Sequence, residues 1–153
     1  MNVLSVLTSG PTAFRGEGVN HERQPFIGAL AIQSLEGGRA ALLTYVATLT
    51  SGEVVHSEST LLGVAPDGNL CLWPVMSELP MVLPHTQTVT SSEPGSFALA
   101  VFGSGTRDDS TSFREEITIR VNSDGSLVYA QAWGLPGGAF EDRSSCTMLP
   151  SVA

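Results

Sequence analysis

The stretch FREEITIRVNSDGSLVYAQAW, residues 113–133, carries the clearest secondary-structure signal in the sequence. In its first half, three apolar residues alternate with polar ones: Ile117, Ile119 and Val121. A period of two is typical of a strand with one buried face. The turn sequence NSDG follows at 122–125, and bulky residues then alternate with small ones over 127–133. The stretch therefore predicts an antiparallel β-hairpin, Phe113–Val121 paired with Leu127–Trp133.

Short strand-like runs separated by turn sequences continue on both sides of this hairpin. The runs are Thr12–Val19, Phe26–Ser34, Ala40–Thr50, Glu53–Val64, Leu70–Trp73, His85–Thr90, Ser96–Phe102 and Ala139–Leu149. No segment keeps a 3.6-residue period between helix caps, so no long helix is expected. About ten short strands in sequence order predict an all-β fold, a single up-and-down antiparallel β-barrel of the calycin or lipocalin-like kind, because closure leaves no exposed edge.

Two segments do not fit the strand pattern. Residues 1–11 are expected to be an N-terminal extension, with a turn of helix or an irregular plug at Val3–Leu7. Pro74–Pro84 is apolar but holds three prolines, so we expect a bulged edge or a loop over the barrel mouth. At 153 residues the chain is expected to be one domain, 1–153.

Composition limits the classes of partner. The net charge is -8 and all seven basic residues are arginine, which disfavours nucleic acid and anionic membranes. No apolar run approaches the ~20 residues that span a bilayer, and no secretion signal is evident, so a cytoplasmic location is expected. Cys71 and Cys146 are then expected to be two buried thiols rather than a disulfide.

His56 and Glu58 form the one conspicuous ionisable pair, in the run EVVHSESTLLGV at 53–64. Side chains two apart on a strand share a face, so both should point the same way. The pair is either the polar end of a ligand cavity or a structural pair that faces solvent or bonds internally, and alternation does not decide which. Without a third converging ligand or a nucleophile, neither a metal site nor a catalytic set is predicted.

The aromatic residues suggest where a cavity would lie. Trp73, Tyr129 and Trp133 fall on predicted strands, and Gln131 shares a face with the last two. Aromatic walls with a few polar groups suit a small-molecule pocket, although aromatics also simply fill barrel cores. The candidate ligand-binding residues are therefore His56, Glu58, Trp73, Tyr129, Gln131 and Trp133. His21 and His85 fall in turn-like, exposed places and receive no role.

Several motifs resemble the nitrobindin-like proteins, which have a ten-stranded barrel like that of fatty-acid-binding proteins. Phe14-Arg15-Gly16-Glu17-Gly18 is similar to that family's Trp-Arg-Gly-Glu-Gly opening strand. The run at 56–61, His-Ser-Glu-Ser-Thr-Leu, resembles its His-x-Glu-x-Gly strand. The link Asn20–Gln24 is too short for a helical lid, which favours the lidless bacterial type.

The resemblance also implies what should be absent. Nitrobindins hold ferric haem through a histidine on the final strand, whereas Arg143–Leu149 has none and Ser144 falls near the ligand place. We therefore expect no cofactor and a barrel that binds a small apolar or amphipathic ligand, rather than an enzyme. One alternative is a haem-binding, nitrobindin-like protein acting on reactive nitrogen species. The other is a ligand-free structural or interaction domain, in which an exposed Met76–Leu83 segment would favour a homodimer.

Overall fold

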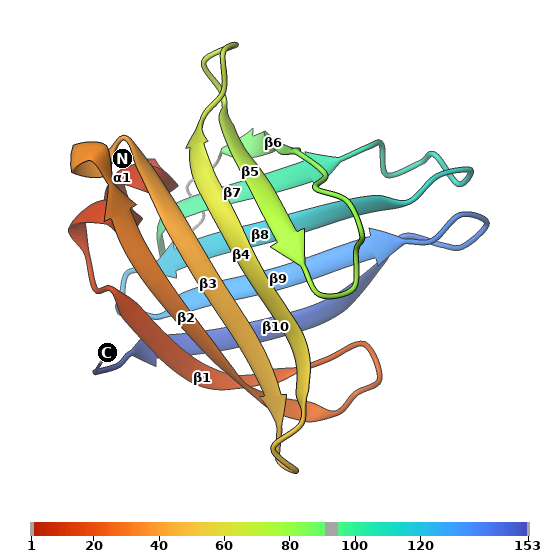
Figure 1. Cartoon of the computed structure of the whole chain (residues 1–153), viewed down its shortest axis with the longest axis horizontal. Coiled ribbons are helices and arrows are strands. Elements are labelled where there is room, and N and C mark those ends of the chain that lie inside the picture. The colour runs from red at the N-terminus through yellow and green to blue at the C-terminus, as the bar shows by residue number, and fades with distance from the viewer. Residues whose placement is uncertain (1, 91–94, 153) are drawn as a thin grey trace.

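The computed structural model describes residues 2–90 and 95–152, which fold into one closed antiparallel barrel (Figure 1). The ends of the predicted domain, residues 1 and 153, lie outside the described residues. Ten strands pair in sequence order, and the first closes onto the last. They are β1 (Ala13–Val19), β2 (Pro25–Leu35), β3 (Ala40–Leu49), β4 (Val54–Val64), β5 (Leu70–Met76), β6 (His85–Thr90), β7 (Ser96–Ser104), β8 (Arg114–Asn122), β9 (Leu127–Gly134) and β10 (Glu141–Pro150). The predicted fold class is confirmed.

The hairpin of β8 and β9 forms in the expected register. Val121 lies opposite Leu127, and the two strands stay paired as far as Arg114 and Gly134. In the turn, the Asp124 carboxylate accepts a hydrogen bond from the Ser126 amide at 2.9 Å. Gly125 has a φ of 87°, a left-handed conformation that glycine adopts without steric cost. Local turn chemistry therefore sets this register.

Glycines on β1 allow the barrel to close. A Cβ atom at Gly16 would overlap the backbone of Thr147 on β10, and one at Gly18 would overlap the ring of Phe26 on β2. Glycine inside a strand commonly marks such a close approach. The strand that begins the barrel can therefore bend inward and pair with β2 on one side and β10 on the other.

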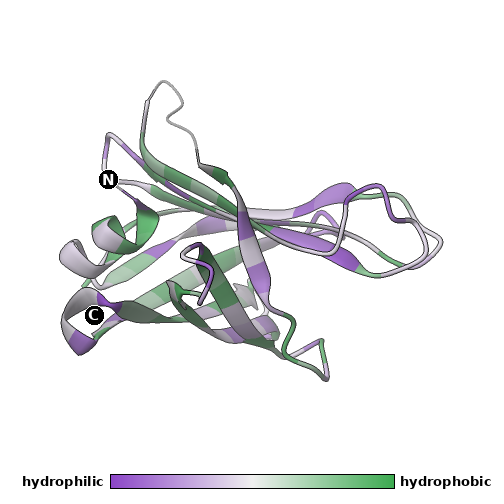
Figure 2. Ribbon diagram, turned by 90° about the horizontal axis from the view of Figure 1, so that it is seen from above, coloured by the Kyte–Doolittle hydropathy of each residue, from purple (hydrophilic) through white to green (hydrophobic). Residues whose placement is uncertain are grey.

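Helix α1 (Val3–Ser9) closes one end of the barrel. Its first turn is capped by the Asn2 side chain, which accepts from the Ser5 amide at 2.9 Å. Val3, Leu4 and Leu7 are buried in the hydrophobic core. Seen from above, α1 lies at one end and the long loops project at the other (Figure 2). Of the two forms expected for Val3–Leu7, a turn of helix or an irregular plug, the structure has the helix. Apart from a three-residue 3-10 turn at Glu36–Gly38, the described residues contain no further helix, and none is long enough to cross a membrane.

Every second loop of an up-and-down barrel reaches the same end, so the loop after each odd-numbered strand lies opposite α1. Two of these loops, β7–β8 and β9–β10, are joined by the buried Arg114. Its guanidinium donates to the carbonyls of Arg107 at 3.1 Å, Leu135 at 2.9 Å and Gly138 at 2.7 Å. A Cβ at Gly134 would occupy the place of this guanidinium. Arg114 is thus a structural residue.

The segment 74–84 begins differently from the expectation. Pro74 belongs to β5, which continues to Met76, and the irregular loop starts only at Ser77. After this loop, β5 and β6 pair only through Cys71 with Thr86 and Leu72 with His85. Met81 and Val82 in the loop are exposed, whereas Met76 is buried. The expected loop over the mouth is present, and its apolar residues divide between the interior and solvent.

The two cysteines are free thiols and both are buried, as expected. Cys146 faces the interior from β10 and Cys71 lies on β5. Burial raises the pKa of each thiol, so neither has the character of a reactive thiolate.

Candidate functional site

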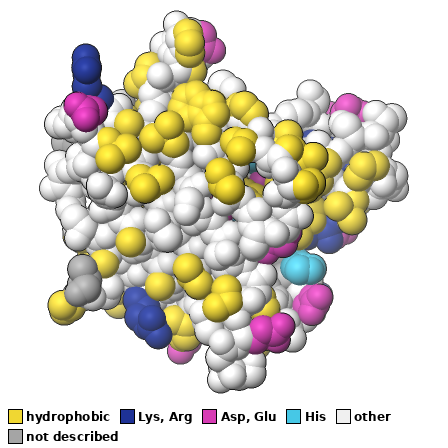
Figure 3. All heavy atoms as spheres, in the orientation of Figure 1, with side chains coloured by type: hydrophobic (Ala, Val, Ile, Leu, Met, Phe, Trp, Pro, Cys, Tyr) yellow, Lys and Arg dark blue, Asp and Glu magenta, His cyan; other side chains and the backbone are white. Residues whose placement is uncertain are grey.

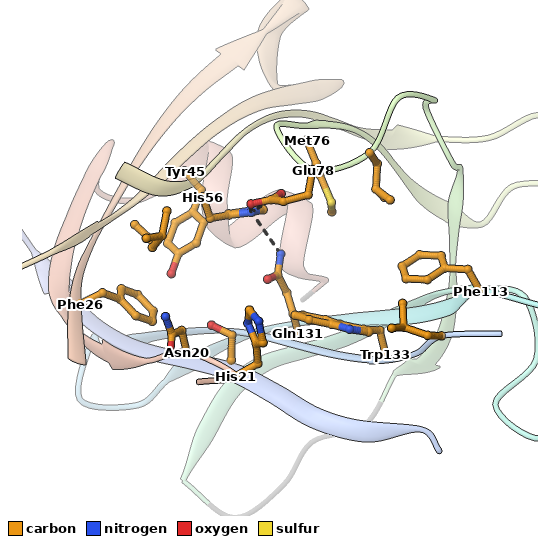
Figure 4. Close-up of a pocket in the computed structure, with 15 residues that line it drawn as sticks. Asn20, His21, Phe26, Tyr45, His56, Met76, Glu78, Phe113, Gln131 and Trp133 are labelled. Atoms are coloured by element: carbon orange, nitrogen blue, oxygen red, sulfur yellow. Dashed lines mark hydrogen bonds and ion pairs between the residues drawn. The ribbon is translucent and has the colours of Figure 1, made fainter. Parts of the chain in front are cut away.

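The open end of the barrel holds a cavity of about 340 Å³ (Figure 4). Much of its wall is aromatic or aliphatic: Phe26, Tyr45, Met76, Phe113 and Trp133. The polar side chains on the wall are Asn20, His21, His56, Glu78, Gln131 and Ser144. These residues come from strands and from several loops of the end opposite α1. The antiparallel topology therefore gathers them from distant parts of the chain.

His56 is the central polar group of the wall. Its Nδ1 lies 2.8 and 2.9 Å from the two oxygens of Glu78. Burial by itself lowers the pKa of His56, but the carboxylates of Glu58 and Glu78 outweigh it and raise the pKa to about 9. The imidazole is therefore positively charged at neutral pH, and the pKa of Glu78 is lowered by the same contact despite its partial burial.

Gln131 reaches across the barrel to His56. Nε2 of its amide lies 3.5 Å from Nε2 of the imidazole, a long contact drawn as a dashed line in Figure 4. A charged imidazole donates from both nitrogens, so the amide must turn its oxygen toward the ring to accept a hydrogen bond here. In that orientation Gln131 and His56 form a weak polar bridge from β9 to β4.

Glu58 lies just inside this bridge. Its neighbours in register on β3 and β5 are Tyr45 and Met76, which both line the cavity, so Glu58 faces the interior at the same level. Its side chain is completely buried, and the closest charged atom is Nε2 of His56 at 3.8 Å. Neither carboxylate oxygen has a hydrogen-bond partner among the described residues.

Two tyrosines complete the inner end of the cavity. The rings of Tyr45 and Tyr129 are 4.6 Å apart and tilted by 35°. The Tyr129 hydroxyl is buried without a hydrogen-bond partner in the part of the chain described. Burial and the nearby charge of Glu58 raise the pKa of Tyr129 well above its ordinary value, so the phenol stays neutral. Burial, the Cys146 thiol and Glu58 do the same to the pKa of Tyr45.

The structure brings five of the six sequence-predicted residues to this end of the interior. His56, Gln131 and Trp133 line the cavity directly. Glu58 and Tyr129 are buried at its inner end. The sequence pattern left the orientation of His56 and Glu58 undecided, and in the structure both side chains face the interior of the barrel.

Trp73 is placed elsewhere, which corrects the expectation that it lines the cavity. It lies opposite Leu61 on β4, a residue 39% exposed, and next to Gly63, so it belongs to the outer face. Leu61 on β4 and Val75 on β5 are exposed. Figure 3 shows exposed hydrophobic side chains on the face that β3, β4 and β5 present to the viewer.

Two residues at the mouth of the cavity could not be predicted from the sequence. His21, expected to have no role, lies on the cavity wall with its ring 5.5 Å from that of Trp133 in an edge-on arrangement. Glu78, the closest partner of His56, sits in the loop after β5 and is separated from it by 22 residues. Only the topology shows that both loops reach the end of the barrel where Trp133 lies.

His85 differs most from its expected exposed place. It is completely buried. Its Nδ1 lies 2.6 Å from the Leu83 carbonyl and its Nε2 lies 2.8 Å from the Glu115 carboxylate. Both ring nitrogens are therefore engaged, and the residue is a structural element of the barrel wall.

The site does not fit a haem held as in nitrobindins. Ser144 on β10 lines the cavity at the place where the resemblance expects a histidine, and a serine hydroxyl is not a haem-iron ligand of that kind. His56 already bonds Glu78, and Cys146 is buried behind the wall. Among residues 2–90 and 95–152, no group of three or more histidine, cysteine or acidic side chains is arranged to hold a metal ion.

The fold defines a calycin-like β-barrel, a class whose architecture is compatible with ligand binding. A comparison with solved structures finds Rv2717c from M. tuberculosis, with a TM-score of 0.74 at 15% sequence identity, covering 97% of this chain and 97% of that one. At this identity the likeness supports the fold alone. No protein-family model matches the sequence, and neither does any curated protein.

Proposed function

We propose that this protein binds a small, largely apolar or amphipathic molecule in the cavity at the open end of its barrel. The observation that carries the proposal is the cavity itself, about 340 Å³ of space with an aromatic wall and a few converging polar groups. Binding sites for small molecules are commonly of this size and are predominantly apolar, with polar groups that fix orientation. The apolar body would lie against Phe26 and Trp133, and the polar end would face His56 and Gln131.

A ligand-binding barrel also agrees with the resemblance of the sequence to the nitrobindin-like proteins. The chain would be a lidless barrel related to nitrobindins and fatty-acid-binding proteins, with ligand binding kept and haem binding absent. Loop residues replace a helical lid, since Leu79 and Leu135 border the cavity from the β5–β6 and β9–β10 loops. We propose a cytoplasmic binding protein without nucleic-acid or membrane partners, in keeping with its net charge of -8.

The two tryptophans allow the location of binding to be tested. Trp133 lines the cavity and Trp73 lies on the outer face. In Trp73→Phe, the remaining tryptophan should change its fluorescence as a ligand enters. In Trp133→Phe, the remaining tryptophan should not respond. Native mass spectrometry of the purified protein, before and after addition of candidate molecules, identifies ligands for this titration.

The proposal would be overturned by two results together. Native spectra would show no bound small molecule with any candidate, and Trp133 would report no change at millimolar ligand. A response from Trp73 alone would instead place binding on the outer face of β4 and β5. That result would support an interaction domain, and sedimentation would then decide whether the partner is a second copy.

A further inference from the structure

We propose that the ligand carries a protonated amino group, which Glu58 binds at the inner end of the cavity. This inference rests on the proposed binding function and specifies the chemical class of the ligand. It follows from three features of the inner end: a buried carboxylate without a hydrogen bond, the hydroxyl groups of the interior that also lack one, and the charge of the residues around the cavity.

Glu58 is unusual for a buried carboxylate. Both of its oxygens are buried without a hydrogen-bond partner among the described residues. Removing an ionised carboxylate from water is costly unless donors replace the lost hydration. His56 cannot fully supply them, because its Nδ1 is engaged with Glu78 and its Nε2 remains 3.8 Å from Glu58. The carboxylate is therefore available to a donor that enters from the cavity.

Two more buried hydroxyls of the interior lack a well-formed hydrogen bond among the described residues. One belongs to Thr60, two residues further along the same face of β4. The other belongs to Tyr129, which lies close enough to Glu58 for the charge and hydrogen-bonding capacity of the carboxylate to raise the pKa of the phenol. A primary ammonium has three N–H donors and no acceptor. The Glu58 carboxylate and the nearby Tyr129 hydroxyl oxygen can both accept a hydrogen bond from such a group.

The charge of the wall favours a cation over an anion. Glu58 and Glu78 contribute two carboxylates against the single imidazolium of His56. None of the described residues that line the cavity is an arginine, and the sequence has no lysine. A carboxylate ligand, such as a fatty acid, would meet two acidic groups without an arginine to receive it. The paired rings of Tyr45 and Tyr129 add aromatic surface that attracts cations.

We expect access to Glu58 to pass beside Gln131. His56 and Gln131 both line the cavity, and their side chains approach each other at 3.5 Å. The contact is long and weak, so rotation of the Gln131 side chain would open the way. An ammonium could then reach Glu58 while the apolar body of the ligand stays against Trp133.

Three probes of similar shape test the inference: phenethylamine, phenethyl alcohol and 3-phenylpropionate. Isothermal titration at pH 7 should show the amine binding at least tenfold more tightly than the alcohol, and the carboxylate most weakly. In Glu58→Gln, the preference for the amine over the alcohol should fall to less than threefold, because the charge that selects the amine is gone. Glu17→Gln, a carboxylate on the exposed face of β1, is the matched control and should keep the preference.

Equal binding of the amine and the alcohol by the native protein would overturn the inference and leave the proposed function intact. A preference that survives in Glu58→Gln would also overturn it, because the selecting charge would then be another group. If no probe binds while Trp133 responds to other molecules, the amine inference fails alone. The proposed function fails only if Trp133 responds to no molecule and native mass spectra show none bound.

Discussion

Two histidines of this barrel face buried glutamates, and the two pairs are built in opposite ways. His85 bonds the Leu83 carbonyl with one nitrogen and Glu115 with the other, and the whole pair is sealed from solvent. His56 bonds Glu78 in a loop, touches Gln131 only at 3.5 Å and leaves Glu58 without a hydrogen bond. The same residue types thus form one pair in which both histidine nitrogens make hydrogen bonds, and one pair in which the oxygens of Glu58 accept none.

The contrast between the two pairs indicates where in the barrel a polar group has a structural role. His85 lies at the narrow seam between β5 and β6, where two residue pairs hold the strands together and a bonded imidazole adds a further link. His56 lies beside the cavity, where its partners come from a loop and from the opposite wall. The fully hydrogen-bonded His85 pair is therefore interpreted as a structural part of the barrel wall. Glu58, whose oxygens are buried without a hydrogen bond, is interpreted as a group that can bind a ligand.

The largest effect is expected from breaking the saturated pair. His85→Ala removes two hydrogen bonds and leaves Glu115 buried without its partner. The free energy of unfolding should fall by about 3–5 kcal/mol, because a buried charge that loses its partner keeps its desolvation cost. Urea unfolding measures it, and His21→Ala, on a half-exposed side chain, should change stability by less than about 0.5 kcal/mol. A small loss in His85→Ala would show that the two pairs are alike.

A smaller effect is expected from the pH dependence of His56. Its pKa is raised from 6.5 to about 9, so its pairing contributes fully to stability below about pH 6.5 and is lost as the pH rises through about 9. The loss between pH 6 and pH 10 should be about 3 kcal/mol. Comparing the native protein with His56→Gln by urea unfolding at pH 6 and pH 10 isolates it from other titrating groups. Identical losses in both proteins would contradict the assigned charge of His56.

The smallest effect on stability is expected at Glu58. Glu58→Gln removes a buried charge that makes no hydrogen bond, and the closer carboxylate of Glu78 remains to pair with His56. The lost attraction and the relieved desolvation cost should largely cancel, so stability should stay within about 1 kcal/mol of the native value. Glu115→Gln is the matched comparison and should lower stability, because Glu115 does bond its histidine. Thermal unfolding distinguishes the two variants. A marked loss in Glu58→Gln would show that this carboxylate also supports the wall.

Most of the fold could be predicted from the sequence because its signals are local. Hairpin turns such as 122–125 and alternation such as Ile117 and Ile119 each depend on a few neighbouring residues. The strand of His56 was found, but its mixed apolar parity could not show which face it buries. Trp73 follows three apolar residues in a row, so no alternation revealed that it faces outward.

The parts of the site that could not be predicted depend on contacts between distant residues. Because His85 directly follows Pro84, it was expected in an exposed turn. Its burial depends on Glu115, which lies 30 residues further along the chain. Glu78 belongs to a loop whose position over the mouth follows from barrel closure. The residues next to His85 or Glu78 in the sequence do not indicate which distant residue each one contacts.

The central claim is that the open end of the barrel binds a ligand beside His56 while the His85 pair remains a fixed part of the wall. The most direct measurement is a ¹H–¹⁵N NMR titration of the native protein with phenethylamine. The account predicts shifts in the indole signal of Trp133, the side-chain amide of Gln131 and the ring nitrogens of His56. The indole of Trp73 and the ring of His85 should stay unchanged. Shifts at Trp73 or His85 without a change at Trp133 would contradict it.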